Sequence, residues 1–134
     1  MTAGRPEHSP RAFRRCGACR QRWLSPEAFL DDPRLRVVGL QVAPHAPEAN
    51  LLVFEHGCGS SVSVLTSRLR SLLTISDPES DVDDLYGARE CNLYCRRLEE
   101  WAACDRPCVN ARDRRLLQVI LARKGQFSPR RPTP

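Results

Sequence analysis

Residues 51–59 read Leu-Leu-Val-Phe-Glu-His-Gly-Cys-Gly, and this stretch indicates both a fold element and a chemistry. Residues 51–56 form a short, strongly apolar segment with β-branched and aromatic side chains, which is typical of a buried strand. Gly57 and Gly59 flank Cys58 and mark a tight turn after the strand. The strand therefore ends in a His-x-Cys turn, whose His56 and Cys58 are potential metal ligands.

The segments on both sides of this strand also predict strands. Residues 35–42 are rich in β-branched residues, and residues 61–65 alternate polar and apolar side chains, as a strand with one buried face does. A short helix is expected over 24–30, with Ser25 as its N-cap and Pro26 in its first turn. A second helix is expected over 66–73, where leucines recur at helical spacing. We therefore expect a small antiparallel sheet of about three strands.

The first group of candidate ligands combines this turn with a Cys-x2-Cys pair further upstream. Cys16 and Cys19 form that pair, and His56 and Cys58 would complete a four-ligand site. A Cys-x2-Cys turn lets two thiolates face one ion. His56 is equally consistent with a histidine that is satisfied by hydrogen bonds at a strand end, in which case three cysteines leave one position open.

This group resembles a zinc ribbon over the Cys16–Cys19 half and the Cys58-Gly59 turn, and the resemblance stops there. Gly17 and Gly59 occupy places where glycine permits the backbone angles of such turns. A zinc ribbon would have a second Cys-x2-Cys pair where this chain has His-x-Cys. The resemblance implies a zinc-ribbon-like sheet tied by zinc.

The second group of candidate ligands contains four cysteines in two Cys-x3-Cys pairs. They are Cys91, Cys95, Cys104 and Cys108. We expect 91–103 to be a helix, residues 105–107 a turn and 109–123 a longer helix. Cysteines four apart on a helix share one face, so a Cys-rich helical hairpin could bring four sulfurs to one point. Such a site suits zinc, or alternatively one [4Fe–4S] cluster, because thiolate ligation alone does not separate the two.

This second group also resembles oxidised helical hairpins that are held together by two disulfides. That resemblance implies pairing of Cys91 with Cys108 and of Cys95 with Cys104. It requires an oxidising compartment, for which the sequence gives no other sign. An odd total of seven cysteines also argues against a fully paired framework.

Length and charge suggest one domain between charged ends. The 134 residues fit a single α+β domain over 15–124, made of a β-rich part (15–75), an acidic linker (76–90) and a helical part (91–124). Residues 1–14 and 125–134 are expected to be disordered. The net charge is +5 over residues 1–24, +6 over 110–134 and −6 between them. Twenty of the 21 basic residues are arginine, a bias that a GC-rich bacterial genome would produce without selection for phosphate contacts.

No catalytic motif and no signal peptide or membrane-spanning run is found, so we expect a cytoplasmic binding module rather than an enzyme. The expected role is structural, interaction or regulatory, with two zinc ions and an unidentified protein partner. Nucleic acid is a further candidate through the basic ends. The alternatives are an iron–sulfur electron-transfer or redox-sensing protein that uses the second cysteine group, and a thiol enzyme that uses Cys16 and Cys19.

Overall fold

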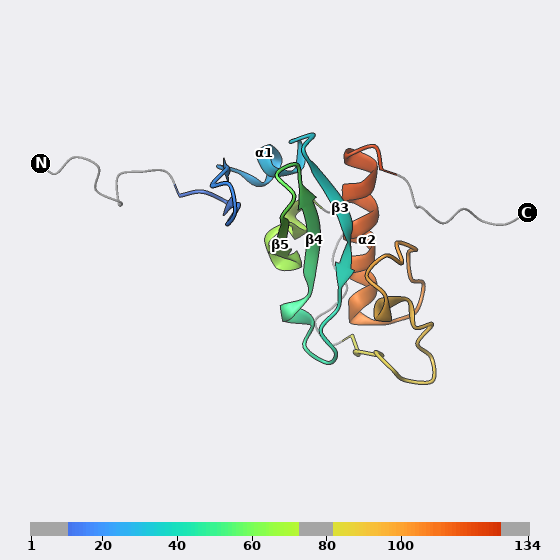
Figure 1. Cartoon of the computed structure of the whole chain (residues 1–134). Coiled ribbons are helices and arrows are strands. Elements are labelled where there is room, and N and C mark those ends of the chain that lie inside the picture. The colour runs from blue at the N-terminus through green and yellow to red at the C-terminus, as the bar shows by residue number, and fades with distance from the viewer. Residues whose placement is uncertain (1–10, 73–81, 127–134) are drawn as a thin grey trace, which may run out of the picture.

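A computed structural model describes residues 11–72 and 82–126 of the chain, and this part has an α+β fold. Figure 1 shows a central sheet with one long helix beside it. The strands are β1 (Arg14–Arg15), β2 (Arg22–Trp23), β3 (Leu35–Gln41), β4 (Leu51–His56) and β5 (Ser61–Leu65). The α-helices are α1 (Pro26–Leu30) and α2 (Val109–Arg123). Short 3-10 turns complete the elements: η2 (Pro47–Ala49), η3 (Thr66–Arg68), η4 (Arg70–Leu72) and η5 (Tyr94–Arg96).

The predicted three-stranded antiparallel sheet is confirmed, with strand order β3-β4-β5. Strand β4 pairs with both neighbours, so its alternate residues Leu52, Phe54 and His56 lie on the buried face. A bulge between Val37 and Gly39 shifts the register of β3. This shift keeps both Val37 and Leu40 buried, although a regular strand would place residues three apart on opposite faces.

Helix α2 packs on this sheet and supplies the other half of the core. Its range agrees with the expected helix over 109–123, and the expected buried residues Leu116, Leu117, Ile120 and Leu121 are all inside. Burial of such leucine side chains contributes roughly 1.5–3 kcal/mol each. Trp101 joins the same core and donates its indole N–H to the Val38 carbonyl at 2.8 Å.

Helix α1 begins as the sequence predicts and closes the other end of the core. The Ser25 hydroxyl accepts from the Ala28 amide at 3.0 Å, which caps the first turn. Phe29 on this helix meets Trp23 and Phe54 edge-on, with ring centroids 5.0 and 4.8 Å apart. The aromatic side chains are therefore core residues, as expected.

Two predicted helices are wrong. The segment after β5 forms the two 3-10 turns η3 and η4, because the buried Thr66 is held by side-chain hydrogen bonds to Asp113 and Arg70; residue 73 lies outside the described residues. The helix expected over 91–103 is replaced by an extended loop that contains only η5. Leu93 has a left-handed φ of 67°, which an α-helix does not accommodate. The Cys91 sulfur accepts the Leu93 amide and the Asn92 side chain accepts the Tyr94 amide, and such local side-chain hydrogen bonds favour turns over helix.

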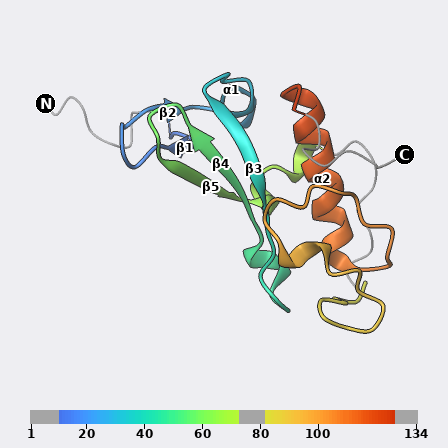
Figure 2. The same ribbon diagram turned by 45° about the vertical axis from the view of Figure 1, so that its right-hand side comes forward.

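The predicted helical hairpin is therefore absent, and α2 packs beside a cysteine-containing loop instead. This loop, residues 82–108, runs along the N-terminal half of α2, as the turned view in Figure 2 shows. Residues 76–81 of the expected acidic linker and most of both expected disordered ends lie outside the described residues. The described edges do make contacts: Phe13 packs on Phe29, and the Gln126 side chain bonds both backbone groups of Val37. No described helix has the length and apolar character that crossing a bilayer requires.

Candidate metal centre

Two hairpin turns bring the first group of predicted ligands together. Cys16 and Cys19 lie in the turn between β1 and β2, whereas His56 is the last residue of β4 and Cys58 lies in the turn that follows it. The sulfur atoms of Cys16 and Cys58 are 3.6 Å apart, and the His56 Nδ1 lies 3.2 Å from the Cys58 sulfur and 3.6 Å from that of Cys19. All four ligand atoms lie within 4.8 Å of one another. Four ligands about 2.0–2.3 Å from one tetrahedral ion would be separated by about 3.3–3.8 Å, so this group could hold a metal ion.

The backbone of the two turns explains the spacing of the ligands. In the first turn, the Arg20 amide donates to the Cys16 carbonyl at 3.0 Å, and Arg20 has a left-handed φ of 67°. Gly17 does not have a positive φ, so the expectation that it supplies the special angle of this turn is wrong. In the second turn the expectation is confirmed for Gly59, whose φ is 96° and whose amide donates to the His56 carbonyl.

One side of the site is buried and the other faces solvent. Cys16 is fully buried and His56 is 2% exposed, whereas Cys19 and Cys58 are exposed. Glu55 points to the opposite, solvent face of β4, as predicted from strand alternation. The buried face of the His56 ring meets Trp23 edge-on at 5.3 Å.

Histidine 56 presents Nδ1 to the three sulfurs rather than to a hydrogen-bonding partner elsewhere. Its other ring nitrogen, Nε2, is buried and has no hydrogen-bond partner within residues 11–72 and 82–126. Hydrogen-bonded and metal-bound histidines both normally satisfy their second nitrogen, so the direction of Nδ1 is what separates the two alternatives. The orientation therefore supports ligation through Nδ1 over the alternative of a satisfied strand-end histidine.

Sequence reasoning missed Ser60, which lies between the two turns. Its hydroxyl oxygen is 3.2 Å from the Cys16 sulfur and 3.1 Å from the Cys58 sulfur. The hydrogen bond from Ser60 is the main cause that lowers the pKa of Cys16 to about 5 and that lowers the pKa of Cys58 as well. The sequence feature that could have revealed this role is the position of Ser60, two residues after the candidate ligand Cys58.

The pKa values of the other two ligands, Cys19 and His56, are raised. A backbone hydrogen bond from Gln21 lowers the pKa of Cys19, but burial and the neighbouring thiols outweigh it, so this pKa is raised. Desolvation lowers the pKa of His56, but its contacts with Cys58 and Cys16 outweigh that effect and raise it. The site thus contains two acidic thiols that raise the pKa of the neighbouring imidazole, and a metal cation would stabilise the thiolates and displace the imidazole proton.

The second predicted ligand group is not compact. Among the described residues, only the first group has at least three ligand atoms gathered closely enough to hold one metal ion, and its four atoms lie within 4.8 Å of one another. All seven cysteines are free thiols, so neither disulfide implied by the resemblance to oxidised hairpins is present. Cys91, Cys95, Cys104 and Cys108 nevertheless line one pocket together. The described residues therefore show only one of the two expected metal sites, and the metal that it would hold is not identified by the structure.

The remaining histidines do not join either group in the described part of the chain. His45 is exposed in the loop between β3 and β4, with a left-handed φ of 59°. His8 lies outside the described residues.

No model of a known protein family matches this chain, and no curated protein or solved structure is detectably similar to it. Function is therefore inferred from the geometry of the site formed by the four ligands of the first group.

Proposed function

We propose that this protein is a metal-binding module in which Cys16, Cys19, His56 and Cys58 hold one structural zinc ion. The observation that carries the proposal is the convergence of four ligand atoms from two separate turns within 4.8 Å. Three thiolates and one imidazole are a common ligand set for structural zinc. Closed four-ligand sites of this kind leave no position for a substrate, which favours a structural role over a catalytic one.

The zinc ion would join the first hairpin to the sheet. Strands β1 and β2 have only two residues each, and a hairpin of that length is not stable alone. Its other described ties to β5 and η3 are few: Arg14 donates to the Ser63 carbonyl at 3.0 Å, and Arg68 lies 4.3 Å from the centre of the Phe13 ring. A zinc ion bound across both turns would supply a stronger connection, because its binding free energy becomes folding free energy.

The same module would act as a cytoplasmic interaction or regulatory protein rather than as an enzyme. A thiol enzyme that uses Cys16 and Cys19 is disfavoured because Cys16 is fully buried. The partner would be another protein, with nucleic acid as the alternative through the basic ends. Binding to nucleic acid would weaken steeply with added salt, so a salt titration of binding to DNA or RNA separates the two partners.

Zinc content and folding test the proposal directly. The full chain is purified, its zinc is measured by elemental analysis, and circular dichroism is followed while a strong chelator removes the metal. We expect zinc at the first site and loss of the sheet signal on chelation. Unchanged circular dichroism after complete metal removal would refute a structural ion.

Two histidine variants provide a matched comparison. His56→Asn removes one proposed ligand, and His45→Asn makes the same chemical change at an exposed position where asparagine tolerates the left-handed backbone. We expect His56→Asn to weaken zinc binding and His45→Asn to leave it unchanged. Equal zinc affinity in both variants would contradict ligation by His56.

A further inference from the structure

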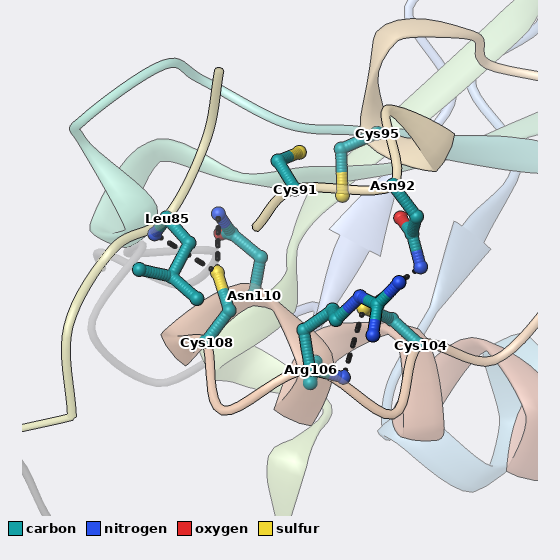
Figure 3. A pocket seen from close by; sticks show the side chains of 9 residues that line it. Leu85, Cys91, Asn92, Cys95, Cys104, Arg106, Cys108 and Asn110 are labelled. Atoms are coloured by element: carbon teal, nitrogen blue, oxygen red, sulfur yellow. Dashed lines mark hydrogen bonds between the residues drawn. The ribbon is translucent and has the colours of Figure 1, made fainter. Parts of the chain in front are cut away.

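The pocket beside the start of α2 is a second place where sulfur chemistry is concentrated. It lies at the opposite end of the sheet from the first site, as the positions of β4 and α2 in Figure 1 show. Figure 3 shows the four cysteines around it, with Cys91 and Cys95 on one side and Cys104 and Cys108 on the other. The other residues that line it are Leu85, Asn92, Arg106, Asn110 and Ala111.

Each of the four sulfurs accepts at least one N–H group. Cys91 accepts from the Leu93 amide (3.3 Å), Cys95 from Arg114 Nη1 (3.7 Å), Cys104 from the Arg106 amide (3.4 Å) and Asn92 Nδ2 (3.4 Å), and Cys108 from the Leu85 amide (3.2 Å) and Asn110 Nδ2 (3.8 Å). Donors of this kind stabilise thiolates and are the means by which proteins tune sulfur-ligated metal centres. The loop therefore provides a set of donors directed at four sulfur atoms.

Positive charge also faces these sulfurs. Arg114 is fully buried, and its guanidinium group lies against the Cys95 sulfur while it also bonds the carbonyls of Glu100 and Ala102. Cys108 is the N-cap of α2, so its sulfur lies at the positive end of a 15-residue helix. A metal centre with four thiolates has a net negative charge, which these groups would compensate.

The spacing of the sulfurs distinguishes a single ion from a cluster. Four thiolates on one zinc ion are about 3.8 Å from one another, as a Zn–S distance of about 2.3 Å and tetrahedral geometry require. Within the described residues, only the first ligand group has three or more ligand atoms gathered closely enough to hold a single metal ion, and these four sulfurs do not form such a group. In a [4Fe–4S] cluster each thiolate binds a different iron at a corner of the cube, so the four sulfurs stand further apart while they still face one centre.

We propose that Cys91, Cys95, Cys104 and Cys108 bind one [4Fe–4S] cluster. This proposal goes beyond the zinc site and does not depend on it. The contrast inside one chain supports it, because the same fold holds the first ligand group at single-ion spacing and the second group at a wider spacing.

The test is anaerobic reconstitution of the full chain with ferrous iron and sulfide. Iron, acid-labile sulfide and zinc are measured separately, together with the visible absorption spectrum. We expect about four iron and four sulfide per chain and a brown colour, with zinc at the first site unaffected. Cys104→Ser is expected to lose iron and sulfide. The control is Ala103→Ser, which introduces the same residue at the exposed neighbouring position and is expected to keep both.

Zinc content and circular dichroism distinguish a lost cluster from a lost fold. A Cys104→Ser variant that keeps its zinc and its sheet signal but lacks iron supports the proposal. If this variant unfolds, the iron, sulfide and zinc content of the wild-type chain decides whether a cluster is bound. Two zinc ions without iron or sulfide, two irons with two sulfides, or a wild-type chain that takes up no iron would each overturn it.

Discussion

The buried carboxylate of Asp113 on α2 offers a sharp test of how the core is held together. It is fully buried and accepts from Asn50 Nδ2 at 2.9 Å, from Thr66 Oγ1 at 2.8 Å and from Arg70 at 3.0 and 3.1 Å. These donors come from the loop before β4 and from the two 3-10 turns. One side chain of α2 therefore connects the loop before β4 with the 3-10 turns after β5.

Asp113→Asn would replace an acceptor oxygen by an NH2 group that faces other donors, and it would remove the charge that Arg70 pairs with. Loss of one partner from a buried ion pair costs about 3–5 kcal/mol. Because the Arg70 side chain is 19% exposed and can be partly rehydrated, we expect a value near the lower end of that range. A loss of about 3 kcal/mol is large against a total stability of about 5–15 kcal/mol, and at about 4 °C per kcal/mol it lowers Tm by roughly 12 °C.

Urea unfolding of the metal-loaded protein, followed by circular dichroism, measures this loss. Glu55→Gln is the matched control, because it makes the same acid-to-amide change in a surface pair with Arg36 at 3.9 Å, where both side chains are more than half exposed. We expect less than about 1 kcal/mol for this control. If Asp113→Asn costs no more than Glu55→Gln, the reasoning about the buried network is wrong.

Three further predictions concern the two cysteine sites. Ser60→Ala removes the hydroxyl beside the sulfurs of Cys16 and Cys58, so we expect zinc affinity to fall about 10–100-fold in a chelator competition titration; an unchanged affinity would show that the hydroxyl has no role. The pKa of Cys16 is about 5 in the folded chain against an ordinary 9.0, so the stabilisation by its thiolate is complete above the ordinary value and is lost as pH falls through about 5. Zinc release followed with a chromogenic chelator should therefore be small at neutral pH and complete below about pH 5, and a flat profile over that range contradicts the assignment. Gly39→Ala places a methyl group against the backbone carbonyl of Leu98. We therefore expect the free energy of unfolding measured in urea to fall by about 1–3 kcal/mol, and the adjacent loop to retain iron less well. Wild-type stability in this variant would show that the loop moves aside without cost.

The sequence was sufficient for the three-stranded sheet, for α1 and α2, and for the ligands of the compact site, but not for the β1–β2 hairpin. Strands β4 and β5 match their predicted limits because apolar alternation and the flanking glycines define them locally. Helix α2 matches for the same reason, since its leucines repeat at helical spacing. Cys16 could be paired with Cys19, and His56 with Cys58, because short turns impose their own geometry on the residues within them, and the two pairs were joined because both lie in the N-terminal half of the chain.

The cysteine loop could not be predicted because its conformation depends on partners far away in the chain. The spacing of Cys91 and Cys95 suits one helical face, and the sequence contains no proline between them that would forbid a helix. The helix loses to contacts that only the folded protein provides: Arg114 of α2 bonds two loop carbonyls, and the Trp101 indole reaches the backbone of β3. Local periodicity contains no information about such contacts.

The uneven burial of the first site has a consequence for the movement of metal in and out of the protein. Cys16 and His56 are fixed in the interior, while Cys19 and Cys58 are open to water. An incoming thiol or chelator can therefore approach from one direction only, and it meets the two outer sulfurs first. Exchange of the ion would proceed by stepwise replacement of these outer ligands while the inner pair still holds it, so the lifetime of the bound metal is set by local ligand substitution and not by the rate at which the whole domain unfolds.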